Sequence, residues 1–282
     1  SMKKIIKLII KLFAKNIIKF LAKFSTGRYF LEHLEEKIFD QKKTIIHNNL
    51  SLSFFIPNRL NLFRVNTFFT KEPETLNWIE NFDEKSVFWD IGANIGLYTC
   101  YAAKLKSCKV YAFEPSAFNL ELLTKNIFLN KISSSVIVAP YALTDKASEN
   151  KFNFSLTERG GAMSTFGENH EYVSKTEKQF FYKTIGLSID ESIDFLKINQ
   201  PDYIKIDVDG IEHLILKGGI KTLKKTRSVL VEVDDNSKNQ AKKISEYLIN
   251  AGFKFSEKKH SDMVEHSKFH SIYNQIWNKI TH

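Results

Sequence analysis

Cysteine, proline and glycine are scarce in this 282-residue chain, and its first 24 residues contain no acidic side chain. The two cysteines, Cys100 and Cys108, lie without metal-ligand spacing in one predicted strand–helix unit, which argues against a disulfide scaffold and a zinc site. Five prolines and eleven glycines form no low-complexity linker. With 43% hydrophobic residues the chain can bury an ordinary core, and the sparse cysteine predicts a reducing, cytoplasmic location.

The net charge of +9 is concentrated at the N-terminus. Residues 1–24 hold seven of the 41 basic residues, and the remaining chain carries 34 basic against 32 acidic residues. A nearly neutral body does not indicate a surface that follows nucleic-acid phosphates, so we expect no nucleic-acid partner.

The N-terminal segment has the pattern of a basic amphipathic helix. Lysines recur at about every fourth position from Lys3 to Lys23, with isoleucine, leucine and phenylalanine between them. The regular charges disfavour a membrane span, and no uninterrupted apolar run marks a secretory signal. Two interpretations of residues 2–24 remain open: peripheral contact with an anionic membrane at its inner face, or packing on the domain or on another subunit.

From residue 83 onward, apolar strand patterns alternate with helical ones. Strands are expected at Val87–Ile91, Lys109–Phe113 and 135–139, with helices at Leu97–Leu105 and Ala117–Leu129 between them. This alternation predicts an α/β fold with a mostly parallel sheet and helices on both faces. We therefore divide the chain into a basic helix, residues 1–24, an N-terminal accessory segment, residues 25–82, and a ligand-binding domain, residues 83–282.

Small and acidic residues gather where the first two of these strands end. Gly92 and Gly96 allow backbone amides to approach a ligand closely, with Asn94 between them. Asp90 can organise this turn or receive a cationic amino group, and Glu114 can accept two ribose hydroxyls. Because the glycine spacing is not the G-x-G-x-x-G of a pyrophosphate site, we predict a nucleoside ligand without phosphate.

The second half brings further acids to the same sheet edge. Residues 146–200 form a long connection, and its glycine-containing part, residues 157–170, is expected to cover the substrate. Strands at 203–208 and 228–233 would then deliver Asp207 and Glu232 to the carboxyl edge. Residues 253–255 and 271–277 are candidates for the last two strands.

These motifs resemble those of the FkbM-type methyltransferases, a branch of the Rossmann-like class I S-adenosylmethionine fold, from about residue 68 to residue 235. The most specific block, Lys-Ile-Asp-Val-Asp-Gly-Ile-Glu at 205–212, resembles the family's K-I-D-V-E-G-x-E, with Asp209 in place of the usual glutamate. The resemblance implies methyl transfer from S-adenosylmethionine, typically to a hydroxyl of a sugar, polysaccharide, glycolipid-like acceptor or secondary metabolite. It implies cofactor contacts at Glu74, Thr75, Asp90, Gly92, Asn94, Gly96, Glu114 and the backbone of Ala142.

Transfer of a methyl group to an alcohol needs a group that aligns the nucleophile and removes its proton. Asp207 is the first candidate for this role, His213 the second because of the pKa of imidazole, and Glu232 the third. A Mg²⁺ site of Asp207 with Asp234 or Asn236 is an alternative that the spacing disfavours, and we assign no metal ligand.

Two other functions are weighed against the methyltransferase. An oxidoreductase using a nicotinamide dinucleotide would need the phosphate-binding glycine pattern that this turn lacks. A catalytically inactive, membrane-associated module with a methyltransferase-like body would bind the cofactor without turnover. Titration with both cofactors and an acceptor panel separates these alternatives.

Overall fold

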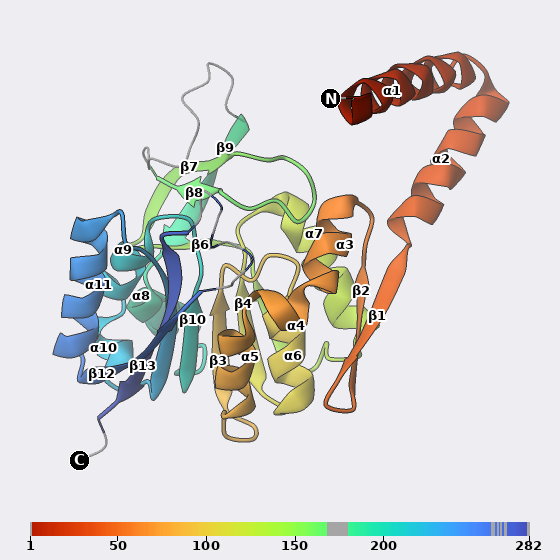
Figure 1. Ribbon diagram of the computed structural model, residues 1–282. Coiled ribbons are helices and arrows are strands. Elements are labelled where there is room, and N and C mark those ends of the chain that lie inside the picture. Colours follow the sequence, from red (N-terminus) through yellow and green to blue (C-terminus); the bar gives the residue numbers. More distant parts are fainter. Residues whose placement is uncertain are drawn as a thin grey trace.

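A seven-stranded sheet forms the centre of the protein, in the order β12-β13-β11-β10-β3-β4-β5 (Figure 1). The computed structural model describes residues 2–167, 180–260, 263, 265, 267 and 270–280. Six strands of this sheet run in one direction, and β13, between β12 and β11, runs in the opposite direction. The strands are β3 (Val87–Ile91), β4 (Lys109–Phe113), β5 (Val136–Ala139), β10 (Tyr203–Ile206), β11 (Ser228–Asp234), β12 (Phe253–Lys259) and β13 (Ile272–Lys279). The fold is therefore the α/β fold with a mostly parallel sheet expected from the sequence.

The central strands are apolar because helices cover both faces of the sheet. Neighbouring residues of β3 face opposite ways: Phe88 belongs to one hydrophobic cluster and Trp89 to the other, and both are fully buried. The first cluster is built with α5 (Pro73–Glu80), α6 (Leu97–Leu105) and α7 (Ala117–Leu129). The second is built with α8 (Ile189–Leu196), α9 (Glu212–Lys217), α10 (Ile220–Leu223) and α11 (Lys238–Asn250).

A second, four-stranded sheet lies above the carboxyl edge of the first in the view of Figure 1. Its order is β6-β9-β7-β8, made of β6 (Ala142–Leu143), β7 (Ser148–Phe154), β8 (Thr165–Phe166) and β9 (Phe180–Leu187). The long connection predicted from the sequence thus contains its own sheet, and the stretch before residue 168 turns back over the main sheet. Residues 168–170 of the expected covering loop lie outside the described residues.

The N-terminal region starts as an arm and ends as part of the core. Helices α1 (Met2–Leu21) and α2 (Ser25–Phe39) project from the body (Figure 1), and the hairpin of β1 (Lys42–His47) and β2 (Leu50–Phe55) follows. Its turn residues Asn48 and Asn49 both have positive φ, 48° and 64°, as a tight hairpin requires. Helices α3 (Arg59–Asn66) and α4 (Phe68–Lys71), which the sequence pattern did not reveal, lead to α5. Side chains of β2, α3 and α5 join the cluster under α6, so residues 50–82 are continuous with the main core.

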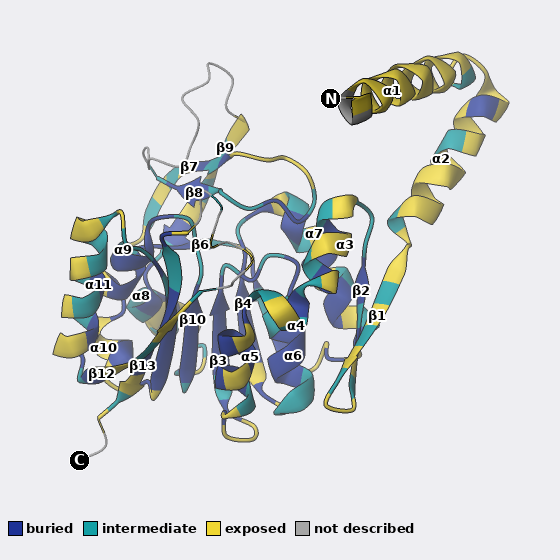
Figure 2. Ribbon diagram, in the orientation of Figure 1, coloured by how far each residue is buried: buried dark blue, intermediate teal, exposed yellow. Residues whose placement is uncertain are grey.

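The helix predicted for the basic segment is present as α1. Among its described side chains only Leu21 is partly buried, so the helix does not pack on the body of its own chain (Figure 2). In the described part of the chain, no helix combines the length and apolar character needed to cross a bilayer.

Candidate active site

A cavity of about 370 Å³ opens at the carboxyl ends of β3, β4 and β10. The chain leaves β3 toward β4 on one side, while β10 pairs on its other side, so a crevice forms at this switch of direction. The turn after β3, the residues after β4 and β10, the loop 161–166 and part of α3–α5 line the cavity. This is the crevice in which open α/β sheets bind ligands.

The glycine turn forms the floor of the cavity. Gly92 has φ +84°, and a Cβ at this position would lie 2.0 Å from the carbonyl oxygen of Asp207. The amides of Gly92 and Ala93 both donate to the carbonyl of Phe113 at 3.0 Å, which joins the turn to β4. Asn94 also has positive φ, +51°, and lines the cavity. Only a residue without a Cβ lets β10 approach this closely at Gly92.

Glu114 faces this turn from the end of β4. Its Oε2 accepts from the amide of Asn94 at 2.8 Å and its Oε1 from the amide of Ser116 at 2.7 Å. Burial of the carboxyl raises the pKa of Glu114 to about 7, although both amides oppose the shift. A buried carboxylate aimed at the turn is the geometry needed to accept ribose hydroxyls, which stays our prediction for this residue.

Other predicted cofactor residues support the wall from behind. Asp90 is buried and does not line the cavity; its Oδ2 accepts from the Thr99 hydroxyl at 2.5 Å, and burial raises its pKa. Gly96 begins α6 and also lies outside the lining. These positions shape the turn, so a direct ligand contact by Asp90 or Gly96 has no geometric support.

The acid that reaches the cavity from the start of α5 is Glu72. Glu74 and Thr75 are buried behind it, outside the lining, and Glu74 accepts from the side-chain amide of Asn274 at 2.8 Å. Cofactor contacts by Glu74 and Thr75 therefore stay a prediction, and Glu72, on the other side of Pro73, is the acid in the lining.

Glu72 belongs to a charged end of the cavity. Its Oε1 lies 2.6 Å from Lys71 Nζ, and its Oε2 accepts from the Tyr98 hydroxyl at 2.8 Å. Burial alone would raise the pKa of Glu72, but Lys71 and Lys205 outweigh it and hold the pKa lowered. Both signs of charge are therefore fixed at one end of the cavity.

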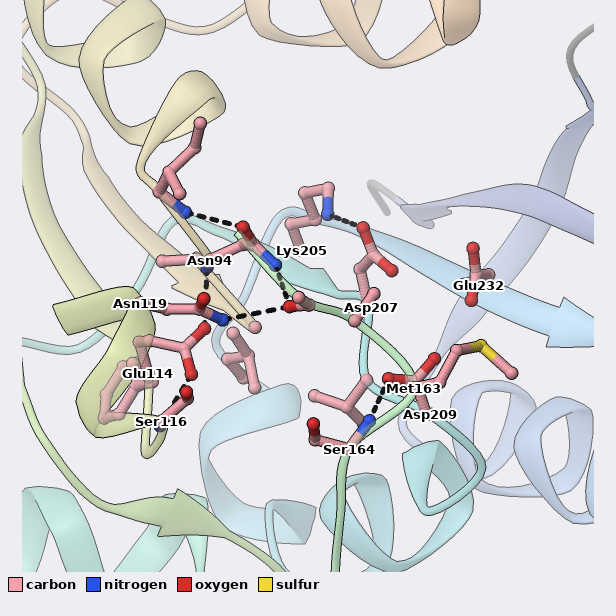
Figure 3. Close-up of a pocket in the computed structure, with 18 of the residues that line it drawn as sticks. Asn94, Glu114, Ser116, Asn119, Met163, Ser164, Lys205, Asp207, Asp209 and Glu232 are labelled. Carbon is pink, nitrogen blue, oxygen red and sulfur yellow. Dashed lines mark hydrogen bonds and ion pairs between the residues drawn. The ribbon is translucent and has the colours of Figure 1, made fainter. Parts of the chain in front are cut away.

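The acids from β10 and β11 meet at the same end (Figure 3). Asp207 pairs with the buried Lys205 Nζ at 2.5 Å. Glu232 lines the cavity, and its carboxylate makes no hydrogen bond or ion pair with any described residue. Its pKa is raised well above the usual value by burial and by repulsion from Asp207 and Asp209. In Figure 3, Glu114 and Glu232 lie on opposite sides of the cavity.

Loop 157–166 follows β7 and runs into β8. It covers the cavity and is held by hydrogen bonds from several elements. Gly161 O accepts from the side-chain amides of Asn94 at 2.9 Å and Asn119 at 3.1 Å. Arg64 Nε donates to Gly160 O at 2.9 Å, and Asp209 Oδ2 accepts from the Ser164 amide at 2.9 Å. The lid expected from the sequence is thus tied to α3, to α7 and to the end of β10. The Asp209 variation from the family pattern anchors this lid.

An apolar slot occupies the part of the cavity beyond Glu114. Phe113 and Tyr141 meet edge to face at 5.6 Å, and Ala142, Leu143 and Phe166 complete the slot. Ala142 was predicted to offer backbone groups to adenine, and the structure places it in this lining. A flat, largely apolar base suits such a slot.

Two remaining predictions concern the second candidate base and the metal. His213 is buried on α9 and is not among the lining residues, so the geometry gives it no access to a substrate. Asp234 and Asn236 are occupied with each other and with Ser271. Within the described ranges, no group of three or more histidine, cysteine, aspartate or glutamate side chains is arranged to hold a metal ion.

S-adenosylmethionine fits these groups by its chemistry. The apolar slot suits adenine, Glu114 would hold the ribose, and the paired charges of Glu72, Lys71 and Lys205 match a zwitterionic amino-acid tail. Gly92, Ala93 and Asn94 of the glycine turn line the same cavity. Glu72, Tyr98, Asn119 and Arg64 line the cavity and were not among the residues predicted from the sequence.

Comparison with known proteins agrees with this geometry. The model of the FkbM methyltransferase domain matches residues 90–255, more than half of the chain. The hexuronic acid methyltransferase AglP of Haloferax volcanii is 30% identical over 155 residues, which cover 55% of this chain and 59% of that protein. The methyltransferase sdnD of Sordaria araneosa is 25% identical over 162 residues, covering 50% and 62%. The chain thus spans about three fifths of the length of these curated relatives.

A crystal structure of an FkbM methyltransferase from Methylobacillus flagellatus KT superposes with a TM-score of 0.49 at 14% identity, covering 70% of this chain and 44% of that one. The match to a methyltransferase family argues against the alternative of a nicotinamide-dependent oxidoreductase. The chain belongs to the FkbM methyltransferase family.

Proposed function

We propose that this protein transfers the methyl group of S-adenosylmethionine to a hydroxyl of a sugar, and that its preferred acceptor is a sugar acid or a glycan ending in one. The observation that carries the proposal is the placement of Asp207 and Glu232 in the same cavity as the glycine turn and Glu114. The relative named as a hexuronic acid methyltransferase supports the acceptor class.

The bound cofactor supplies an electrophilic methyl group on a sulfonium. In the transfer a bond forms between the acceptor oxygen and the methyl carbon, the carbon–sulfur bond breaks, and the hydroxyl proton passes to a base of the protein. Glu114 would fix the ribose, while Lys71 and Glu72 would hold the amino-acid tail. The chain thereby aligns the reacting methyl with the acid-rich end of the cavity.

Asp207 and Glu232 have different parts in this proposal. Asp207 is fixed by Lys205 at 2.5 Å, so it serves as a rigid acceptor that orients the substrate hydroxyl. The carboxylate of Glu232 has no hydrogen-bond partner among the described residues, and burial raises its pKa, which favours uptake of the hydroxyl proton. We therefore assign proton removal to Glu232 and orientation to Asp207.

Arg64 favours an acidic acceptor over a neutral one. Its guanidinium lines the cavity, and only its Nε has a hydrogen-bond partner among the described residues. Burial lowers the pKa of Arg64, although the nearby carboxylates of Asp207, Glu72 and Asp209 oppose this shift; the partly desolvated guanidinium is therefore available to pair with an anion. A planar guanidinium pairs with a carboxylate through two parallel hydrogen bonds.

The test is methyl transfer from labelled S-adenosylmethionine to glycans ending in glucuronate, galacturonate or the corresponding neutral sugars. We expect turnover on the acids, a kcat about 10²–10⁴-fold lower in Glu232→Gln, and cofactor affinity near the wild-type value. Arg64→Lys should raise KM for the acids but not for neutral sugars. Tight cofactor binding without turnover on any acceptor would instead support the inactive-module alternative.

A further inference from the structure

Helix α1 exposes an apolar surface that no described part of its own chain covers. It contacts α2, where the corner is tight because a Cβ on Gly27 would lie 2.1 Å from the carbonyl oxygen of Leu21. Along α1, Ile9, Phe13 and Phe20 are 59%, 68% and 61% exposed, and Figure 2 shows the helix exposed along its length. Single exposed apolar side chains are ordinary, but a contiguous set of this size marks an interaction surface.

The two kinds of side chain on α1 occupy different faces. At 3.6 residues per turn, Ile9, Phe13 and Phe20 project to one side, with further isoleucines beside them. Lys7, Lys11 and neighbouring lysines project to the other side. The helix has no acidic residue to neutralise them, so a broad apolar face is bordered by positive charge alone.

These features distinguish among possible partners. A two-stranded coiled coil needs a narrow apolar seam, and its flanking positions pair opposite charges. The apolar face of α1 is wider than such a seam, and two copies would bring lysine against lysine. An anionic lipid surface accepts both faces at once, since the apolar side chains enter the acyl boundary and the lysines reach the headgroups.

We propose that α1 binds an anionic membrane surface, lying in the plane of the interface. Its 20 residues extend for about 30 Å along that plane. The lysines in successive turns prevent the same helix from crossing the bilayer. Helix α2 then connects the membrane-bound helix to the hairpin β1–β2 and the catalytic body, as the arm in Figure 1 shows.

The proposal is tested by cosedimentation of the full chain with phosphatidylcholine vesicles, with and without phosphatidylglycerol. We expect binding to the anionic vesicles alone, weakened at high salt by screening. Replacing three lysines, Lys7→Glu, Lys11→Glu and Lys15→Glu, should weaken binding at least about a hundredfold, since each lysine near the surface accounts for about fivefold. The same three positions changed to arginine should retain binding.

A matched control changes three exposed lysines of the body, Lys224, Lys225 and Lys254, to glutamate. This control has the same net charge as the α1 variant, and it should bind the vesicles like the wild type. Equal losses in both variants, or equal binding to neutral and anionic vesicles, would overturn the proposal. Circular dichroism and cofactor titration confirm that each variant is folded.

Phe13→Ser separates the membrane from a second copy of the chain. It should weaken vesicle binding and leave the molar mass in light scattering, measured without vesicles, at that of the wild-type monomer. A wild-type dimer that Phe13→Ser dissociates would show that another subunit covers this face, and it would contradict the membrane assignment.

Discussion

Glu114 gives the ligand-free protein a specific dependence of stability on pH. Its pKa is raised from 4.5 to about 7 because the carboxyl is buried at the cavity floor. The folded state therefore binds a proton more tightly than the unfolded state between these pH values. The sign is thus opposite to that of a salt-bridged carboxylate: the contribution to stability is present below pH 4.5 and is lost as pH rises to about 7.

The magnitude follows from the difference between the two pKa values. Each pH unit between them changes the free energy of unfolding by about 1.4 kcal/mol, so ionised Glu114 costs about 3 kcal/mol above neutral pH. Glu114→Gln removes the titrating group. The NH2 group of the glutamine side chain would face one of the two backbone N–H donors, which lowers the stability of the variant. This loss of stability does not vary with pH. We expect the stability of the variant relative to wild type to rise by about 3 kcal/mol from pH 4.5 to pH 8.

Urea denaturation of the ligand-free proteins at several pH values measures this difference. Other buried acids, such as Glu212 with a pKa raised to about 8, titrate in both proteins and cancel in the comparison. Glu246→Gln, an exposed carboxylate on α11, serves as the control and should show little change. If the stability difference between Glu114→Gln and wild type is flat across this range, the buried, ionisable state assigned to Glu114 is wrong.

Three further predictions concern the turn, the lid and the orienting acid. Gly92→Ala should destabilise the fold by several kcal/mol, on the order of 3, because its Cβ meets the carbonyl of Asp207 and φ is positive; a melting curve like that of the wild type would contradict this. Asp209→Ala removes the acceptor for the Ser164 amide, so limited proteolysis within 157–166 should accelerate and KM for the cofactor should rise. An unchanged proteolysis rate and an unchanged KM would show that the loop is held by other contacts. Asp207→Asn should lower kcat more than cofactor affinity, and equal activity would remove it from the site.

The strands and helices of residues 87–129 were predictable because their sequence patterns are local. The bounds of β3, α6, β4 and α7 agree with the apolar runs and turns in the sequence. Parallel strands bring their carboxyl ends to one edge, so Glu114 and Asp207 could be placed in one site without knowledge of any contact.

The parts that sequence reasoning missed depend on tertiary contacts. Helix α11, which was not predicted, buries Ile244 and Leu248 one turn apart against the sheet. The lid is tied down by single polar side chains far apart in sequence, such as Asn119 and Arg64, and no periodicity reports such bonds. His213 was chosen for its chemistry, whereas its position on α9 directs it away from the cavity lining. The positions of these side chains depend on how the helices and loops pack together, not on the local helix or strand propensity of the sequence.

Calorimetric titration of S-adenosylmethionine into wild type and Glu114→Ala tests whether the Glu114 carboxylate holds the cofactor. We expect one binding site per chain and a loss of about 1–3 kcal/mol, roughly fivefold to 150-fold in affinity, when the carboxylate is removed. Glu246→Ala, on the exposed surface of α11, should bind as the wild type does. Equal affinity in wild type and Glu114→Ala would show that the cofactor does not lie between the glycine turn and the end of β4.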